Sequence, residues 1–286
     1  MIRYDNLRKQ KLTGSLQTFV LAGLMIFLAL FLGNQLLGNF GMFAAAALGL
    51  FVAFVAFRSS APRLLARTIP VTAYEAPDIH EIVTRLSRRA GLGAVPHIHI
   101  LPAPIMNAMT FEYAGSPHLV LSEPLLESLS TRELVGVVAH EISHIRNGDL
   151  RLFRFVEVVR QATAAMSQFG WILLLFSIPF MFVSSGVVPL SLTLALIAAP
   201  LSSLLLQLAL FRTREFKADL TAAELSGDPR GLAQALYRID RPQTDLFRLL
   251  VPVAAPSESS LFRTHPDTKE RIRRLLSVAA PQVVGL

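Results

Sequence analysis

The stretch STRELVGVVAHEISH, residues 130–144, combines a helix start signal with a metal-binding spacing. Ser130 and Glu133 form an S-x-x-E capping box, in which each side chain satisfies a backbone N–H that the first helical turn leaves without a partner. A helix is therefore expected from Thr131 to about Arg146. Residues four apart lie on one face of such a helix, with their Cβ atoms about 5–6 Å apart.

His140 and His144 have this spacing, so their imidazoles can converge on one zinc ion with Zn–N distances of about 2.0–2.1 Å. Glu141 points beside the ion, where it can accept a proton from a zinc-bound water whose pKa falls to about 7. An HExxH pattern also arises by chance, and a catalytic zinc needs a third protein ligand. Because the chain has no Cys, that ligand must be His, Asp or Glu.

Glu215, within TREFKAD at residues 213–219, is the candidate for the third ligand. Asp219 follows one helical turn later on the same face, where it can accept the second N–H of a ligating imidazole. The alternative is that Glu215 and Asp219 are ordinary solvated acids near a membrane surface. The residues alone leave both interpretations open.

Other polar residues compete for attention around this motif. His97 and His99 alternate along a predicted strand and could chelate a metal, although such residues more often occupy the solvated face of a strand. Asp149, at the end of the HExxH helix, is expected to be a cap or a structural hydrogen-bond partner. His118 is expected at the surface.

Two long blocks of the chain carry no Asp, Glu, Lys or Arg, and they run from Leu12 to Phe57 and from Gln161 to Phe211. Overall, 52% of the 286 residues are apolar and 16% are charged, against about 25% charged in average globular chains. Each block is long enough for two passes of about 20 residues. The alternatives are a cleaved signal peptide for the start of the first block and a soluble helical hairpin for the second. We expect four spans, near residues 16–36, 41–57, 164–183 and 187–210.

Lys and Arg flank these uncharged blocks, as in Arg8, Lys9 and Lys11 before the first block and Arg212 and Lys217 after the second. Cytoplasmic flanks of membrane spans are rich in Lys and Arg. The chain is thus expected to be a multi-pass protein of the cell membrane (inner or plasma membrane), with its catalytic domain and both termini in the cytoplasm. The net charge is +7, and since much of the Lys and Arg lies in these flanks, the lipid bilayer is the expected partner and nucleic acid is not.

Four segments follow from this division, and the fold class is α+β, mainly helical, with four transmembrane helices in two hairpins. The polar segment after the first hairpin is expected to contain a helix from Pro77 to about Ala90, a strand at His97–Leu101, and a β-hairpin around Gly115-Ser116. The segments are residues 12–57 (transmembrane hairpin 1), 58–160 (first part of the catalytic domain), 161–211 (transmembrane hairpin 2) and 212–286 (second part).

The motifs together resemble the HtpX-type membrane metallopeptidases, relatives of the CAAX prenyl endopeptidases. The resemblance rests on His140–His144 with Asn147 and Asp149, and on Arg214-Glu215-Phe216-x-Ala218-Asp219 after a hydrophobic hairpin. It extends to Asn107-Ala108, to LFRTHP at residues 261–266, and to Arg271. One departure is that Met109 and Thr110 follow Asn107-Ala108, where the resemblance leads us to expect Phe-Ala, and this concerns the shape of the substrate cleft.

This resemblance implies a zincin-like catalytic domain with one Zn²⁺ ion per chain and with Glu215 as the third zinc ligand. It implies that His265 and Arg271 approach the metal site, and that Asn107 lies on an edge strand beside the cleft. It also implies proteolytic quality control, with polypeptide substrates that include membrane proteins. The sequence does not set the oligomeric state.

We therefore expect a membrane-bound, zinc-dependent endopeptidase that cleaves misfolded or unfolded membrane proteins at the cytoplasmic face. Glu141 would carry the proton from water to the leaving amine, and His265 or Arg271 would donate to the developing oxyanion. The β-compatible segment 106–111, with Asn107 and Ala108, would bind substrate as an added strand, unless it is an ordinary hairpin strand.

Three other functions compete with this expectation. The first is a catalytically inactive membrane scaffold or regulator with a peptidase-like domain, against which the complete set of His140, Glu141, His144 and Glu215 argues. The second is a CAAX-type processing peptidase, which the small number of spans disfavours. The third is a four-span transporter, but transporters place ionisable groups inside the membrane, and these spans have none.

Overall fold

The computed structural model describes residues 4–59, 65–181, 190–240 and 267–279. It divides into two compact units, each assembled from segments far apart in the sequence. We call them the mixed unit, with residues 1–14, 61–150 and 212–286, and the helical unit, with residues 15–60 and 151–211.

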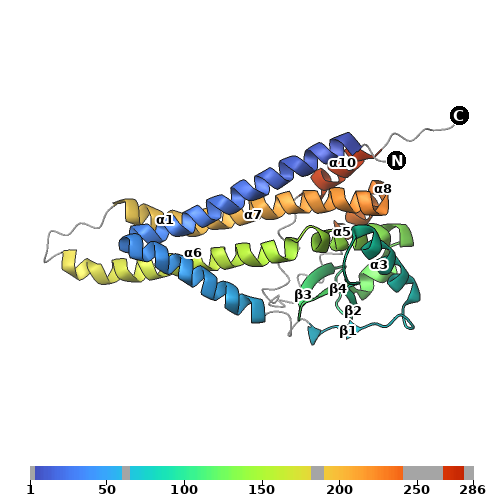
Figure 1. The fold of residues 1–286 in the computed structure, drawn as a ribbon, viewed down its shortest axis with the longest axis horizontal. Helices are drawn as coiled ribbons and strands as arrows, with labels where there is room; N and C mark the ends of the chain where they lie inside the picture. Colours follow the sequence, from blue (N-terminus) through green and yellow to red (C-terminus); the bar gives the residue numbers. More distant parts are fainter. Residues whose placement is uncertain (1–3, 60–64, 182–189, 241–266, 280–286) are drawn as a thin grey trace. The chain divides into compact units, whose positions relative to one another are not determined.

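The mixed unit contains a four-stranded sheet with strand order β1-β2-β4-β3 (Figure 1). Strand β2 runs parallel to β4, whereas the β1–β2 and β3–β4 pairs are antiparallel. Among the described strands, β3 therefore lies at one edge of the sheet. The strands are β1 (Ile69–Pro70), β2 (His97–Leu101), β3 (Ala108–Tyr113) and β4 (Ser116–Ser122).

The β3–β4 hairpin forms where the sequence predicts it. Its two-residue loop has positive φ at both positions, 49° at Ala114 and 78° at Gly115, as a type I′ turn requires. At the open end, the N–H of Ser122 donates to the carbonyl of Asn107 at 2.9 Å, and the N–H of Asn107 donates to Ser122 Oγ at 2.7 Å. These bonds at both ends fix the register of the edge strand.

One face of the sheet packs against helices. Leu119 and Leu121 of β4 are fully buried together with Val138 and Ile142 of α5 (Thr131–Arg146). Helix α3 (Pro77–Ala90) adds its apolar face to the same cluster and ends at Gly91, whose φ of 69° is left-handed. The bounds of α3, β2 and α5 confirm the predictions made from turn and capping signals.

The positions of β2 and β4 that alternate with the core residues include histidines. His99 and His118 are 7% and 9% exposed, and His99 Nε2 lies 2.9 Å from His118 Nδ1. The expectations that His118 is a surface residue and that His99 is solvated are therefore wrong. The parallel register His99↔Val120 staggers the two rings so that they meet across the strands, which residue spacing along one strand cannot reveal.

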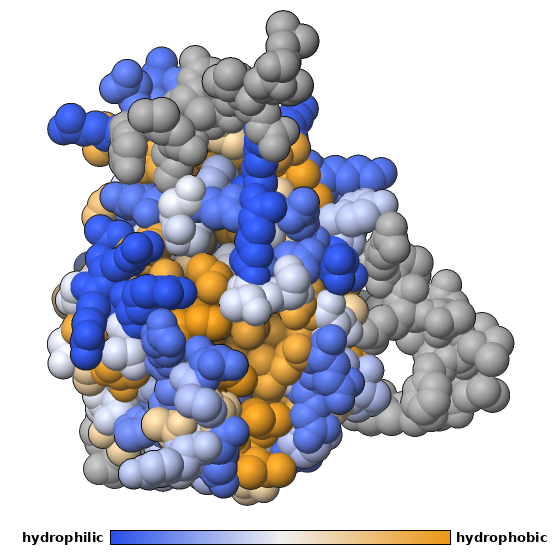
Figure 2. Space-filling view, turned by 90° about the vertical axis from the view of Figure 1, so that its right-hand side faces the viewer, coloured by the Kyte–Doolittle hydropathy of each residue, from blue (hydrophilic) through white to orange (hydrophobic). Residues whose placement is uncertain are grey.

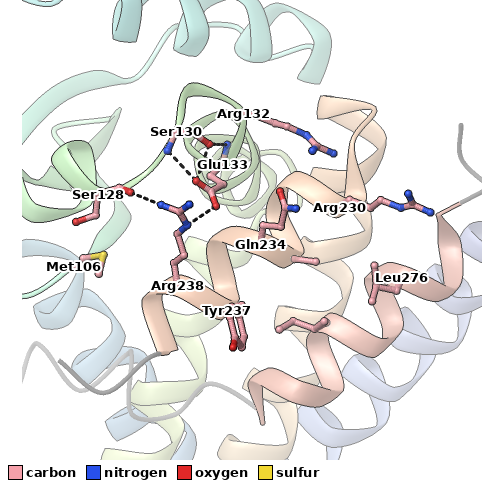
Figure 3. Close-up of a pocket in the computed structure, with 12 residues that line it drawn as sticks. Met106, Ser128, Ser130, Arg132, Glu133, Arg230, Gln234, Tyr237, Arg238 and Leu276 are labelled. Atoms are coloured by element: carbon pink, nitrogen blue, oxygen red, sulfur yellow. Dashed lines mark hydrogen bonds and ion pairs between the residues drawn. The ribbon is translucent and has the colours of Figure 1, made fainter. Parts of the chain in front are cut away.

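Helix α5 begins with the predicted capping box, because the Ser130 N–H donates to Glu133 Oε2 at 2.9 Å. The other Glu133 oxygen lies 2.9 Å from Nε of Arg238 in α8 (Pro229–Asp240). Figure 3 shows Arg238 pointing toward both Glu133 and Ser128 across a cavity of about 910 Å³. This cavity is lined by residues at the start of α5, in α8 and in the C-terminal helix at 268–278, and the HExxH residues are not among them.

Helices α5 and α8 approach each other closely at Gly136. A Cβ atom there would lie 2.8 Å from the backbone N and Cα of Leu232. The mixed unit is completed by α4 (Glu123–Ser128) and by α10 (Thr268–Val278), whose first turn is capped by the Asp267 carboxylate. Gly136 thus allows α5, the helix that carries the HExxH residues, to pack closely against α8.

The helical unit is built from α1 (Tyr4–Ser59), α6 (Asp149–Met181) and α7 (Leu190–Ser226). One end of each of these helices consists of residues that belong to the mixed unit. Figure 1 shows α1 bending sharply, and Gly38, with a φ of 60°, lies at the predicted turn. The turn is thus a bend inside one helical element. The second predicted turn, residues 184–186, lies outside the described residues.

Apolar side chains of the helical unit are widely exposed, as in Phe19 (77%), Leu175 (65%) and Leu201 (60%). Figure 2 views the end of the molecule at the right of Figure 1, where hydrophilic side chains cover much of the face around a band of apolar ones. By length and composition, two described segments could cross a membrane, Asp5–Gln35 and Leu194–Ser226. The predicted spans 41–57 and 164–183 are not among them.

Candidate metal centre

Three buried side chains bring lone-pair atoms to one point. His140 Nε2 lies 3.2 Å from His144 Nε2 and 3.4 Å from Glu215 Oε2, and His144 Nε2 lies 3.5 Å from Glu215 Oε1. Each of the three residues is 6% exposed. The two histidines come from adjacent turns of α5 and the glutamate comes from α7, and together they form a group that could hold a metal ion.

Carboxylates on the far side determine which imidazole nitrogens face inward. His140 Nδ1 lies 3.0 Å from Asp219 Oδ1, and His144 Nδ1 lies 2.8 Å from Asp149 Oδ2. A neutral imidazole carries one proton, and a carboxylate partner keeps that proton on Nδ1. Both Nε2 atoms then face each other and Glu215 as acceptors, an arrangement that a shared cation stabilises.

Formal charge points to the same conclusion. Taken with neutral imidazoles, four carboxylates and two guanidinium groups leave two negative charges in a buried region, and uncompensated charge is costly there. A divalent cation would balance them. The six charged side chains, each at most 6% exposed, are Glu141, Asp149, Glu215, Asp219, Arg214 and Arg271.

The same electrostatics appear in the pKa values of the imidazoles. Burial alone would lower the pKa of His140, but Asp219 and Glu215 outweigh it and raise that pKa to about 10. For His144, burial likewise opposes a rise in pKa that Asp149 and Glu215 cause. Since a proton and a metal ion compete for these nitrogens, we expect metal affinity to fall as pH falls.

The spacing of the two imidazole donors also fits a tetrahedral ion. Zn–N and Zn–O bonds of about 2.0–2.1 Å place neighbouring ligand atoms of a tetrahedron about 3.3 Å apart. The two Nε2 atoms are 3.2 Å apart, and Glu215 places its Oε2 3.4 Å from His140 Nε2 and its Oε1 3.5 Å from His144 Nε2. The donor set of two imidazoles and one carboxylate leaves a fourth position, as a catalytic site needs.

Arg271 reaches this group from α10. Its Nε donates to Asp219 Oδ2 at 2.8 Å, and its Nη2 donates to Asp219 Oδ1 at 2.7 Å. The same Nη2 lies 3.5 Å from His140 Nε2 and 3.6 Å from Glu215 Oε2. Burial opposes ionisation of Asp219, yet the Arg271 guanidinium lowers its pKa below the usual range.

Asp149 is held in a similar way by Arg214. Asp149 is the first residue of α6 and is fully buried, and its Oδ1 pairs with the Arg214 guanidinium. Arg214 also donates to the carbonyl of Asn147 at 3.1 Å. The sequence predicts Asp149 as a structural partner but predicts no role for Arg214, although Arg214 directly precedes Glu215 in the chain.

Glu141 lies within the same buried region, and Thr110 Oγ1 of β3 donates to its Oε2 at 3.1 Å. Asn107, directly before this edge strand, is 5% exposed, and Ala108 is part of the apolar core. His265 lies outside the described residues. The structure therefore brings together the predicted metal group with Glu141, Asp219 and Arg271, and it adds Thr110, which the sequence marked only as a departure from a resemblance.

Comparison with known proteins gives one consistent result. The sequence profile of Peptidase family M48 matches residues 73–279, well over half of the chain. A "Protease HtpX homolog" from Pyrococcus abyssi is 34% identical over 278 residues, which is 92% of this chain and 96% of that protein. Another "Protease HtpX homolog", from Acaryochloris marina, is 36% identical over 220 residues, 71% of this chain and 73% of that protein.

Among solved structures, the chain is similar to the crystal structure of Ste24p from S. mikatae. The identity is 18% and the TM-score is 0.47, with 93% of this chain and 66% of that chain covered.

The contact between Asp219 and His140 leads to the first prediction. Asp219→Asn keeps the size of the side chain but removes the charge that holds the Nδ1 proton. Loss of such a supporting carboxylate weakens metal affinity by about 10- to 100-fold. Metal competition with a chelator should show this loss, whereas Asp228→Asn, which removes a carboxylate that pairs with Arg132, should leave affinity unchanged. Equal affinity in the Asp219 variant and the parent would contradict the assignment.

Proposed function

The chain belongs to peptidase family M48 and is a membrane metallopeptidase, and we propose that it is a zinc-dependent endopeptidase that cleaves unfolded segments of membrane proteins. The observation that carries the proposal is the buried group of His140, His144 and Glu215 with Glu141 beside it. His140, His144 and Glu215 would hold one Zn²⁺ ion. Asp219 would orient His140 from behind.

In this mechanism the metal ion and Glu141 have separate roles. When bound, zinc supplies Lewis acidity, which makes water more acidic and polarises a peptide carbonyl. Glu141, one residue after a ligand, takes a proton from the attacking water and returns it to the leaving amine. Its burial keeps bulk water from competing for that proton.

Arg271 or His265 is the proposed donor to the developing oxyanion. Arg271 is 4% exposed and lies beside the metal group, and although burial opposes its charge, Asp219 and Glu215 raise its pKa and keep it charged. A fixed positive charge close to developing negative charge lowers the barrier without reorganisation. For His265 the proposal rests on the family resemblance of the segment 261–266.

Replacing Glu141 tests the activity. Glu141→Gln should keep the metal content of the parent and lose proteolysis by about 10²- to 10⁴-fold, because a carboxamide cannot act as the base. Casein cleavage and metal analysis of the purified protein in detergent provide the measurement, and Glu81→Gln on the exposed face of α3 is the control. Cleavage by Glu141→Gln at the parent rate would contradict the mechanism and favour another base; a parent chain with no cleavage would favour the inactive scaffold.

We also propose a multi-pass topology in the cell membrane, with the mixed unit and both termini in the cytoplasm. The basic residues that flank the apolar segments support this orientation. A peptidase placed there would meet cytoplasmic loops of other membrane proteins, and loops that have lost their structure can enter an active site as extended chain.

Single-cysteine labelling tests this topology, since the chain has no Cys of its own. Asn39→Cys, at the exposed bend of α1, should react with a membrane-impermeant reagent in intact spheroplasts. Glu127→Cys, exposed on α4, should react only after permeabilisation. The reversed labelling pattern would refute the proposed orientation.

Substrate is proposed to bind along β3 as an added strand. Asn107 exchanges bonds with Ser122 of β4, and antiparallel strands alternate in the direction of their backbone groups. The backbone N–H and C=O groups of Met109 and Phe111 therefore point toward β4, as those of Asn107 do. The same groups of Ala108 and Thr110 point away from β4. A peptide paired there would be recognised through its main chain, with weak sequence preference.

Ala108→Pro tests this mode of binding. It removes the outward N–H at residue 108, so KM for an unfolded substrate should rise by about tenfold while metal content stays unchanged, a typical cost of one main-chain hydrogen bond. Ala108→Ser retains the N–H and should behave like the parent, with thermal unfolding of both variants as the check on folding. An unchanged KM in Ala108→Pro would show that this edge does not bind substrate.

A further inference from the structure

The strand that we propose as the substrate edge also contacts the proposed base. We propose that the hydroxyl of Thr110 is a positioning group that holds the Glu141 carboxylate in place for proton transfer. The proposal rests on the peptidase function above and adds a residue to it.

The geometry carries the proposal. Thr110 Oγ1 lies 3.1 Å from Glu141 Oε2 and 3.4 Å from the Glu141 carbonyl oxygen. A hydroxyl has one proton to donate, and the nearer acceptor is the charged one. Hydrogen bonds to carboxylates are stronger than those between neutral groups, so the proton is directed at Oε2. The other oxygen, Oε1, is then left to face the reacting water.

Both partners are held rigidly. Thr110 pairs with Leu119 in the β3–β4 register, and its β-branched side chain has few rotamers. Ala108, on the same face of β3, is buried in the core against which α5 packs. Glu141 is itself 6% exposed on α5. The hydroxyl therefore sits on a fixed strand and restrains one rotatable carboxylate that otherwise could turn about its last bond.

The backbone of Thr110 also lies where the substrate is proposed to bind. Its backbone N–H and C=O belong to the outward set of β3, so a substrate paired with this strand would bond to the same residue whose side chain bonds to Glu141. Binding of substrate and orientation of the base would then share one residue. This arrangement predicts that loss of the hydroxyl changes turnover and leaves substrate affinity intact.

A purely structural role makes a different prediction. In that case the hydroxyl would only tie β3 to α5 through the Glu141 carbonyl, and its removal would lower thermal stability without changing turnover per correctly folded, metal-loaded molecule. The split between kcat and KM, together with rescue by serine, separates the two roles, because serine keeps the hydroxyl and loses only a methyl group.

The experiment compares Thr110→Val with Thr110→Ser in the full-length protein in detergent. Thr110→Val should lower kcat by about tenfold, a fraction of what a positioned base contributes, with KM and metal content unchanged. Thr110→Ser should recover at least half of the parent kcat. Thr163→Val removes a buried hydroxyl that bonds to a helix carbonyl in α6 and serves as the matched control, with parent kcat.

Metal content and the midpoint of thermal unfolding are measured for each variant, so that kcat is expressed per folded and loaded molecule. Parent kcat in Thr110→Val, or equal losses in the valine and serine variants, would overturn the positioning role while Glu141→Gln remained inactive. If Thr110→Val folds poorly, Thr110→Ala takes its place in the same comparison. Cleavage that does not depend on Glu141 would overturn both the proposed function and this inference.

Discussion

Two imidazoles on one helix each direct one nitrogen to a carboxylate and the other nitrogen to a common point. Asp219 and Asp149 hold the Nδ1 atoms of His140 and His144 at 3.0 and 2.8 Å. The Nε2 atoms then lie 3.2 Å apart, in a region with few exposed atoms. Two acceptors that close repel each other unless a positive charge, either a proton or a metal ion, lies between them, so the geometry of this group depends on offsetting that repulsion.

The side chains of this group come from three helices, which must meet at one point. Helix α5 supplies the imidazoles, α7 supplies Glu215 and Asp219, and α10 supplies Arg271, which neutralises Asp219 through two hydrogen bonds. Each group is stable in the interior only when its partner is present, since an unpaired buried charge costs several kcal/mol. Metal binding and packing of the mixed unit are therefore coupled, and an error in one helix position is felt at the metal group.

The edge strand contributes in a different way. Its register is set at one end by Ala114 and Gly115 and at the other end by the bonds between Asn107 and Ser122. That register turns the Thr110 side chain toward Glu141 and its backbone away from β4. A shift of one residue would exchange these directions. The turn chemistry of the hairpin thus decides which side chain of β3 contacts Glu141.

The sequence by itself determined the local features: the capped helix at 131–146, the His140 and His144 pair on one helix face, the uncharged blocks and the β3–β4 hairpin. These follow from interactions between residues a few positions apart, which spacing encodes directly. Tertiary structure decided that Glu215 joins His140 across 75 positions (215 − 140) and that His99 meets His118. It also decided that Thr110 reaches Glu141. These contacts depend on how strands and helices pack, and packing is set by the whole core, which no short stretch of sequence contains.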